Sequence, residues 1–221
     1  MIVDFLENKK ASSSLLTLGL SSLASITLLA VRIAATSKIT YIFFAWNLFL
    51  AWIPIAASLL LPQIRNKYGA FILFLCWLAF FPNSPYIITD IVHFHPRGVP
   101  LWYDMILFLS FAWNGLVLGF FSLYNVQIFF DSQFGKIKSW LMVLAAILLC
   151  GFGIYLGRYE RWNSWDMLMD PFDLLRSIFI KMIHPFRFKE VYGISLLFSG
   201  FLLCAYLTLF SFTKIQHGEN K

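Results

Sequence analysis

Two short stretches between long apolar segments hold most of the residues that could do chemistry. In the first, FFPNSPYIITDIVHFHPRGVPLWYD over residues 80–104, Asp90 and His93 lie three positions apart and share a face if the segment is helical. A carboxylate beside an imidazole orients the ring and favours its charged form, as in a general acid and base. The candidate catalytic residues are therefore Asp90, His93 and Asp104, which begins the next apolar run.

Other roles stay open for these residues. Structural hydrogen bonding is the main alternative for Asp90 and His93, and Asp104 could simply complement the positive end of a helix. The same atoms could bind a divalent cation, but there is no HExxH motif and the spacing matches no established ligand pattern, so no metal site is assigned. His95, which precedes Pro96, fits an ordinary loop residue.

The second stretch, GRYERWNSWD over residues 157–166, combines arginines with tryptophans. An arginine guanidinium can donate two parallel hydrogen bonds to one phosphate, so this stretch predicts a site for an anionic headgroup. An aromatic belt with snorkelling arginines, and with Arg161 paired to Asp166, is the competing interpretation. The candidate substrate-binding residues of both stretches are Asn83, Tyr86, Trp102, Tyr103, Arg158, Arg161, Trp162, Asn163, Trp165 and Asp166.

Six apolar segments must position these residues. Each is long enough to cross a bilayer as a helix, because roughly 20 residues span its hydrocarbon core. Pro54 lies inside the second, where it removes a backbone hydrogen bond and could kink the helix. Pro82 and Pro85 lie close together in the third, which is therefore expected to be broken and buried in protein or beside a wet cavity. The predicted spans are residues 11–33, 39–62, 68–89, 103–126, 137–157 and 191–213.

The polar residues inside the spans have structural explanations. Asn47 and Asn114 are expected to bond between helices. Arg32, at the end of the first span, is expected to snorkel to the interface. Ser84 has no activating partner in the sequence, so a serine nucleophile is not favoured.

The segment between the last two spans predicts one further helix. Asp170 can cap a helix that Pro171 opens, and apolar residues gather near one face over residues 171–184. Asp173, Arg176 and Lys181 lie toward the other face, so this helix should lie in the membrane interface. The expected fold is an all-α polytopic membrane helix bundle in a single integral membrane domain, residues 1–221, with six transmembrane helices and one interfacial amphipathic helix.

Composition agrees with a membrane protein. The chain is 60% hydrophobic and 13% charged, with a mean hydropathy of +0.75, whereas soluble domains are about 25% charged. The net charge of +6 comes from basic residues scattered at span ends, which suits lipid headgroups rather than nucleic acid. Membrane lipids are thus the expected partners. No cofactor is assigned, haem being the least favoured, and a protein partner is unknown.

Six spans put both termini on one side of the membrane and both polar stretches on the other. Short segments on the terminal side hold more Lys and Arg once the long loop of residues 158–189 is discounted. The termini are therefore expected in the cytoplasm, and the chain in a bacterial cytoplasmic membrane.

The motifs FPNSPYIITDIVH, PLWYD, FAWNGLVLGFFSLY and GIYLGRYERWNSWD together resemble the bacterial membrane family catalogued as domain of unknown function 1361. The resemblance covers nearly the whole chain and implies a multi-spanning membrane protein, but it implies no activity. The positions that match the family's motifs are Asn83, Pro85, Tyr86, Asp90, His93, Trp102, Tyr103, Asp104, Arg158, Arg161, Trp162, Asn163, Ser164, Trp165 and Asp166.

Three classes of function compete. The leading hypothesis is a membrane-embedded hydrolase or transferase acting on a lipid or lipid-linked anionic substrate at one interface. The broken third span and the intramembrane asparagines would also suit a permease for a small solute. A non-catalytic accessory subunit, docking through its tryptophans and arginines, is the third.

Overall fold

The computed structural model describes residues 2–93, 98–162, 169–184 and 186–218, and over these ranges every regular element is a helix and none is a strand. Within these described ranges, six helices are long and apolar enough to cross a membrane: Ser13–Thr36, Ile42–Gln63, Lys67–Val92, Leu101–Phe134, Lys136–Tyr159 and Lys189–Ser211. The expected all-α polytopic architecture is confirmed, because each predicted span coincides with one of these helices.

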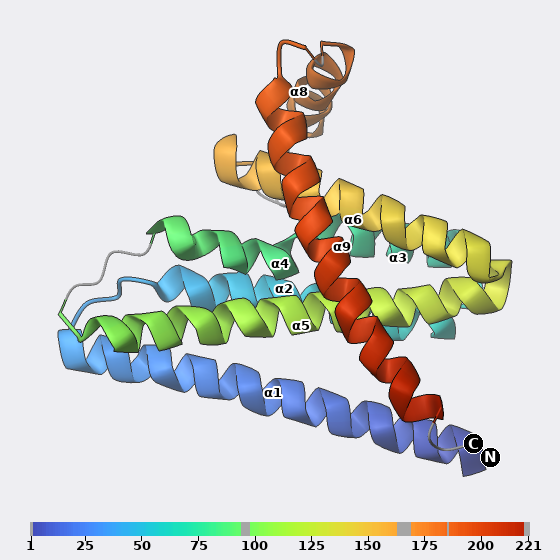
Figure 1. Cartoon of the computed structure of the whole chain (residues 1–221), viewed down its shortest axis with the longest axis horizontal. Coiled ribbons are helices and arrows are strands. Elements are labelled where there is room, and N and C mark those ends of the chain that lie inside the picture. The colour runs from blue at the N-terminus through green and yellow to red at the C-terminus, as the bar shows by residue number, and fades with distance from the viewer. Residues whose placement is uncertain (1, 94–97, 163–168, 185, 219–221) are drawn as a thin grey trace. The chain divides into compact units, whose positions relative to one another are not determined.

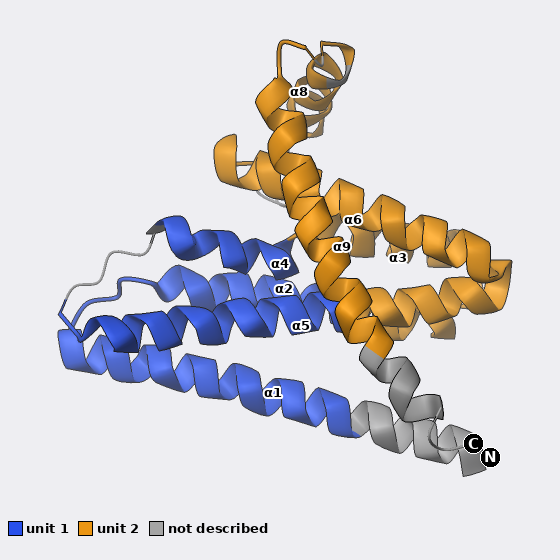
Figure 2. Cartoon of the chain, in the orientation of Figure 1, with its two compact units in different colours: residues 1–56, 83–121 blue, residues 57–82, 122–221 orange. Residues whose placement is uncertain are grey.

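The chain divides into two compact units, and Figure 2 colours them separately. Unit 1 comprises residues 1–56 and 83–121, and unit 2 comprises residues 57–82 and 122–221. The divisions fall inside α2 (Ile42–Leu60), at the Pro82–Asn83 bond and inside α5 (Leu101–Phe134).

Unit 1 contains α1 (Ile2–Thr36), most of α2, the short α4 (Asn83–Tyr86), the 3₁₀ segment η2 (Ile87–His93) and the first part of α5 (Figure 1). Helix α2 continues through Pro54 without interruption. The core of unit 1 includes Phe44 of α2 stacked on Phe111 of α5, with ring centroids 5.3 Å apart. Ile87 and Leu107 are fully buried nearby in the same unit.

The third span is broken as the prolines predict. Helix α3 (Lys67–Phe80) ends just before Pro82, and the chain continues as α4 and then η2. The Ser84 hydroxyl donates to the carbonyl of Ala51 in α2 at 3.2 Å, so this polar group finds a partner inside unit 1. Helix α5 passes so close to the break that a Cβ on Gly115 would lie 2.4 Å from the Ser84 carbonyl oxygen. Only glycine fits there without displacing the backbone.

Unit 2 contains the end of α2, η1 (Leu61–Gln63), α3, the rest of α5, α6 (Lys136–Tyr159), α8 (Pro171–Ile183) and α9 (Lys189–Gly218). Helix α3 begins after Asn66, whose side chain accepts a hydrogen bond from the Tyr68 amide at 3.0 Å. Trp77 on α3 is fully buried, stacks on Phe81 and donates to the Ser122 hydroxyl at 3.3 Å.

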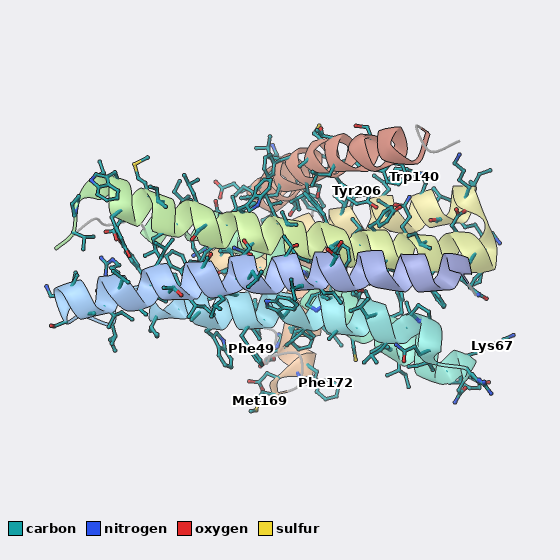
Figure 3. All side chains as sticks on the ribbon, turned by 90° about the horizontal axis from the view of Figure 1, so that it is seen from below. Phe49, Lys67, Trp140, Met169, Phe172 and Tyr206 are labelled. Atoms are coloured by element: carbon teal, nitrogen blue, oxygen red, sulfur yellow. The ribbon has the colours of Figure 1, made fainter. Side chains whose placement is uncertain are left out.

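Helices α6 and α9 pack directly on each other within unit 2. A Cβ on Gly151 would lie 2.2 Å from the Ser199 hydroxyl and 2.4 Å from the Ser195 carbonyl oxygen, so a small residue sets this close approach. Trp140 and Tyr206 lie beside each other in the same helix pair (Figure 3), with ring centroids 6.5 Å apart. The buried Tyr206 hydroxyl donates to Gln127 of α5.

Candidate functional site

Asp90 is a buried carboxylate on the broken third span. It lies in η2, is 2% exposed, and accepts a hydrogen bond at 2.7 Å from the Asn47 side chain of α2. The expected bonding of Asn47 between segments is confirmed. A carboxylate kept from water inside a membrane protein is costly, which is why such a group is a candidate for proton or ion chemistry.

His93, the proposed partner of Asp90, is described by the structure only in its backbone. The backbone of His93 ends η2, while its side chain, together with His95, lies outside the described residues. Acid–base coupling between Asp90 and His93 therefore stays a prediction.

Asp104 forms a buried ion pair that the sequence did not predict. Arg32 donates through Nε to one carboxylate oxygen of Asp104 at 2.6 Å and through Nη2 to the other at 3.3 Å. Both side chains are almost completely buried, and the guanidinium lies 4.3 Å from the centroid of the Tyr41 ring. The expectation that Arg32 snorkels to the interface is wrong, because the Asp104 carboxylate holds it inside unit 1.

This pair changes what Asp104 can do. Both carboxylate oxygens accept charge-assisted bonds from Arg32, and Asp104 also lies in the first turn of α5, where a negative charge is favoured. The neighbouring Tyr103 hydroxyl donates to the Leu28 carbonyl of α1 at 2.7 Å. The geometry favours a role in fixing α1 against α5, and a catalytic role for Asp104 stays a prediction.

Asn114 joins α5 to α1 inside the spans, as expected. Its amide nitrogen donates to the Ser25 hydroxyl at 3.0 Å and to the Ser110 carbonyl at 2.8 Å. Ser22 donates to its side-chain oxygen at 3.4 Å, and the Trp52 indole donates to Ser22 in turn at 3.2 Å. These bonds satisfy polar groups at membrane depth.

The remaining candidates of the first stretch lie on two elements of unit 1, α4 and the start of α5. Asn83 and Tyr86 are half-buried on α4, whereas Trp102 at the start of α5 is 61% exposed. The rings of Trp102 and Tyr103 meet edge to face, 5.9 Å apart. Their role in substrate binding stays a prediction.

Part of the second stretch is visible at the end of α6. Arg158 is half-buried in its last turn and Arg161 is exposed in the turn that follows. Trp162 donates through its indole nitrogen to Glu160 at 3.2 Å. Asn163, Ser164, Trp165 and Asp166 lie outside the described residues, so the pairing of Arg161 with Asp166 stays a prediction.

A polar cluster around Lys181 was missed by the sequence reasoning. The Lys181 ammonium lies 2.8 Å from Glu160 Oε1 and 2.5 Å from the Ser177 hydroxyl oxygen, while Ser177 donates to Glu160 Oε2 at 3.0 Å. An ammonium paired with a carboxylate has no lone pair to accept a serine proton, so the cluster suits docking rather than nucleophilic chemistry. The spacing of Ser177 and Lys181, four apart on a predicted helix, was the available signal.

The candidate residues of the first stretch belong to unit 1 and those of the second to unit 2 (Figure 2), so the expectation that they serve one substrate stays a prediction. Within the described residues, no three histidine, cysteine or acidic side chains come together in a way that could hold a metal ion. An open apolar groove of about 550 Å³ runs between α6 and α9 in unit 2, and its described lining, which includes Lys136, Trp140 and Leu207, contains none of the candidate residues.

A family model described as "Protein of unknown function (DUF1361)" matches residues 46–205. The chain belongs to the DUF1361 family. No curated protein matches it, and no solved structure does. The matched range of this DUF1361 member includes Asp90, Asp104 and the Glu160–Lys181 pair, whereas Arg32 precedes it. Family membership together with the six apolar helices makes it an integral, multi-pass membrane protein.

Proposed function

We propose that this DUF1361 protein is a membrane-embedded hydrolase or transferase that acts on a lipid or lipid-linked anionic substrate at one membrane face. The observation that carries the proposal is the buried Asp90 carboxylate, which is held by Asn47 on a helix that breaks inside the span region. Helix breaks at membrane depth occur where the chain is buried in protein or lines a wet cavity. A carboxylate at such a break is positioned for proton transfer.

The proposed division of labour follows from residue chemistry. Asp90 and His93 exchange a proton with the reacting group, and Arg158 and Arg161 hold an anionic headgroup or phosphate. Alternation of six spans predicts that the loops that follow the third and fifth spans lie on one membrane face, which is the face at which the substrate is proposed to bind. In this proposal Asp104 acts on the fold through Arg32 rather than on the substrate.

The first test is conversion of native membrane lipids by the full-length protein in reconstituted vesicles, followed by mass spectrometry. Asp90→Asn and His93→Gln should abolish conversion, since neither replacement can exchange the proton. Asp131→Asn is the matched control, because Asp131 is an exposed aspartate at the far end of α5. Undiminished conversion by a folded Asp90→Asn protein would remove the proposal.

The anion-binding role has a separate kinetic signature. Arg158→Gln and Arg161→Gln should raise KM with little change in kcat, because they remove binding that is equal in the ground and transition states. A fall in kcat with KM unchanged would assign these arginines to another role.

A permease is the second candidate, and the broken third span is the observation that favours it. Transporter sites are commonly built where spanning helices are interrupted. Flux of a small solute into protein-containing vesicles, lost in Asn47→Leu, would support this function. Vesicles that take up no solute in a broad screen would eliminate it.

The proposed orientation places the termini in the cytoplasm of a bacterial cell and both polar stretches on the outer face. Reporter fusions test it directly. A fluorescent protein fused at the C-terminus should fold and fluoresce, and alkaline phosphatase fused there should be inactive. The reverse pattern would invert the orientation.

A further inference from the structure

Helix α8 divides its surface into three edges. Leu174, Ser177 and Lys181 form the docked edge, which is buried or half-buried in unit 2. Phe172, Leu175, Phe179 and Ile183 form the apolar edge, and all four are exposed. The charged edge contains Asp173 and Arg176, both also exposed. Helical spacing separates these three sets around the axis.

The docked edge is fixed by polar contacts to both neighbouring helices. Lys181 pairs with Glu160 just beyond the end of α6, with its ammonium nitrogen 2.8 Å from the carboxylate oxygen. The Tyr192 hydroxyl of α9 donates to the Lys181 backbone carbonyl at 3.0 Å. The Lys181 side chain is 9% exposed and the Glu160 side chain is 21% exposed, so this lock is mostly buried on the Lys181 side and more open at the carboxylate.

The apolar edge is covered by nothing within the described residues. Phe172 is 85% exposed and Phe179 is 63% exposed, and Phe186 beyond the helix is 84% exposed. The side chains of Met169 and Phe172 extend outward from the ribbon (Figure 3). Soluble surfaces seldom leave such an apolar row uncovered, so a partner is required.

Continuity with the spans identifies that partner. Helix α6 ends at Tyr159 and α9 begins at Lys189, and both are candidate membrane spans, so α8 lies in the segment that joins two spans at one membrane face. A helix in such a segment lies next to the bilayer surface, so lipid is the occupant that its exposed apolar edge would meet. Exposed Arg176 and Arg187 offer positive charge to anionic headgroups beside that edge.

We propose that α8 is a lipid-anchored clamp, meaning a helix that lipid holds along one edge and the rest of unit 2 holds along another. Its apolar edge lies among the acyl chains of a phospholipid interface, and the Glu160–Lys181 pair locks its docked edge to the end of α6. Neither part depends on the chain being an enzyme, so loss of the clamp and loss of lipid conversion are separate outcomes.

Spin labels test the position of the apolar edge in the full-length protein. Cys76 and Cys204, which are exposed, are replaced by alanine, and the buried Cys150 is left in place. A nitroxide is then attached at Leu175→Cys, Phe179→Cys or Asp173→Cys in vesicles of phosphatidylethanolamine and phosphatidylglycerol. Positions 175 and 179 should collide more with oxygen than with a water-soluble nickel complex, and position 173 should show the reverse.

Two results would overturn the lipid assignment. Equal nickel access at 179 and 173 would place the apolar edge in water. Protection of 179 from both reagents would mean that protein covers it, either a second copy of the chain or another partner. A third measurement tests the headgroup contact. In vesicles of phosphatidylcholine alone, the nitroxide at position 179 should lie less deep in the bilayer, because Arg176 and Arg187 lose their anionic headgroups. An unchanged immersion depth would remove the headgroup contact from the proposal.

The Glu160–Lys181 lock is tested by the mobility of the same nitroxide at position 179. Lys181→Met and Glu160→Gln should each increase the mobility of the nitroxide while its oxygen access stays high, because α8 leaves unit 2 but not the lipid. The charge swap Glu160→Lys with Lys181→Glu should restore low mobility, and Asp173→Asn is the matched control on the exposed edge. Unchanged mobility in both single variants would refute the lock.

Discussion

The two units each contain an ion pair built from the same kinds of group, but in different surroundings. In unit 1, Arg32 and Asp104 are 1% and 0% exposed and join α1 to α5. In unit 2, Lys181 and Glu160 are 9% and 21% exposed and join α8 to the end of α6. The first pair is sealed inside its unit, and the second lies where water still reaches the carboxylate.

This difference decides what each pair contributes. A sealed pair recovers little net free energy on formation, but breaking it leaves one charge buried without compensation. A pair near solvent is screened, so either partner can be rehydrated when the other is lost. We therefore expect unit 1 to depend on its pair for folding and unit 2 to depend on its pair for placing one helix.

The largest effect is expected for Arg32→Met. The variant leaves the Asp104 carboxylate buried without its cation, which should lower the free energy of unfolding by about 3–5 kcal/mol. Titration with sodium dodecyl sulfate in mixed micelles, followed by circular dichroism, measures the change. The double variant Arg32→Met with Asp104→Leu should regain most of the loss. If the double variant is no more stable than the single one, burial of the lone charge is not the cause.

Adding a methyl group at a close helix contact should lower the free energy of unfolding by similar amounts in the two units, in contrast to the loss of an ion pair. Gly115→Ala in unit 1 and Gly151→Ala in unit 2 each place a methyl group against a backbone carbonyl, which should cost about 1–3 kcal/mol. Gly200→Ala is the control, because nothing lies within 4 Å of its added methyl group. Melting temperatures in detergent compare all three, and a Gly115→Ala protein as stable as Gly200→Ala would contradict the close approach at Ser84.

Glu160→Gln should have a smaller effect than Arg32→Met. The partly solvated pair should contribute roughly 1 kcal/mol, and the difference between the wild type and the variant should shrink as salt is added. The destabilisation by Arg32→Met should be nearly independent of salt, because its pair is shielded. Unfolding titrations at low and high ionic strength test both statements. Equal salt dependence of the two variants would abolish the proposed distinction.

The smallest effects are expected for neutral hydrogen bonds in the spans. Asn114→Ala in unit 1 and Tyr206→Phe in unit 2 should cost about 0.6 kcal/mol for each interhelical hydrogen bond removed, since bonds between membrane helices have weak net energies. The same sodium dodecyl sulfate titrations measure them. A loss as large as that of Arg32→Met in either variant would show that charge is not what distinguishes the ion pair of unit 1.

The predictions from sequence succeeded where a local pattern controls the structure. Pro82 and Pro85 predicted the break between α3 and α4, because proline cannot donate a helical hydrogen bond and clashes with the preceding turn. Pro171 predicted the start of α8, which begins at that residue, but the predicted cap is wrong, because the Asp170 side chain makes no capping hydrogen bond. Where pairing between distant residues decides the outcome, sequence was insufficient, and the position of Arg32 was predicted wrongly.

The sequence by itself determined the membrane class, the six apolar helices and the polar stretches between them, because hydropathy and proline chemistry act over neighbouring residues. Only the tertiary structure decided that Arg32 faces Asp104 and that Lys181 faces Glu160. Helix spacing puts Arg32, Asp104 and Lys181 each on a face of its helix, but the partner on that face comes from a segment distant in the chain. Which helices become neighbours depends on close packing, such as that permitted by Gly115 and Gly151, and this is a property of the folded chain.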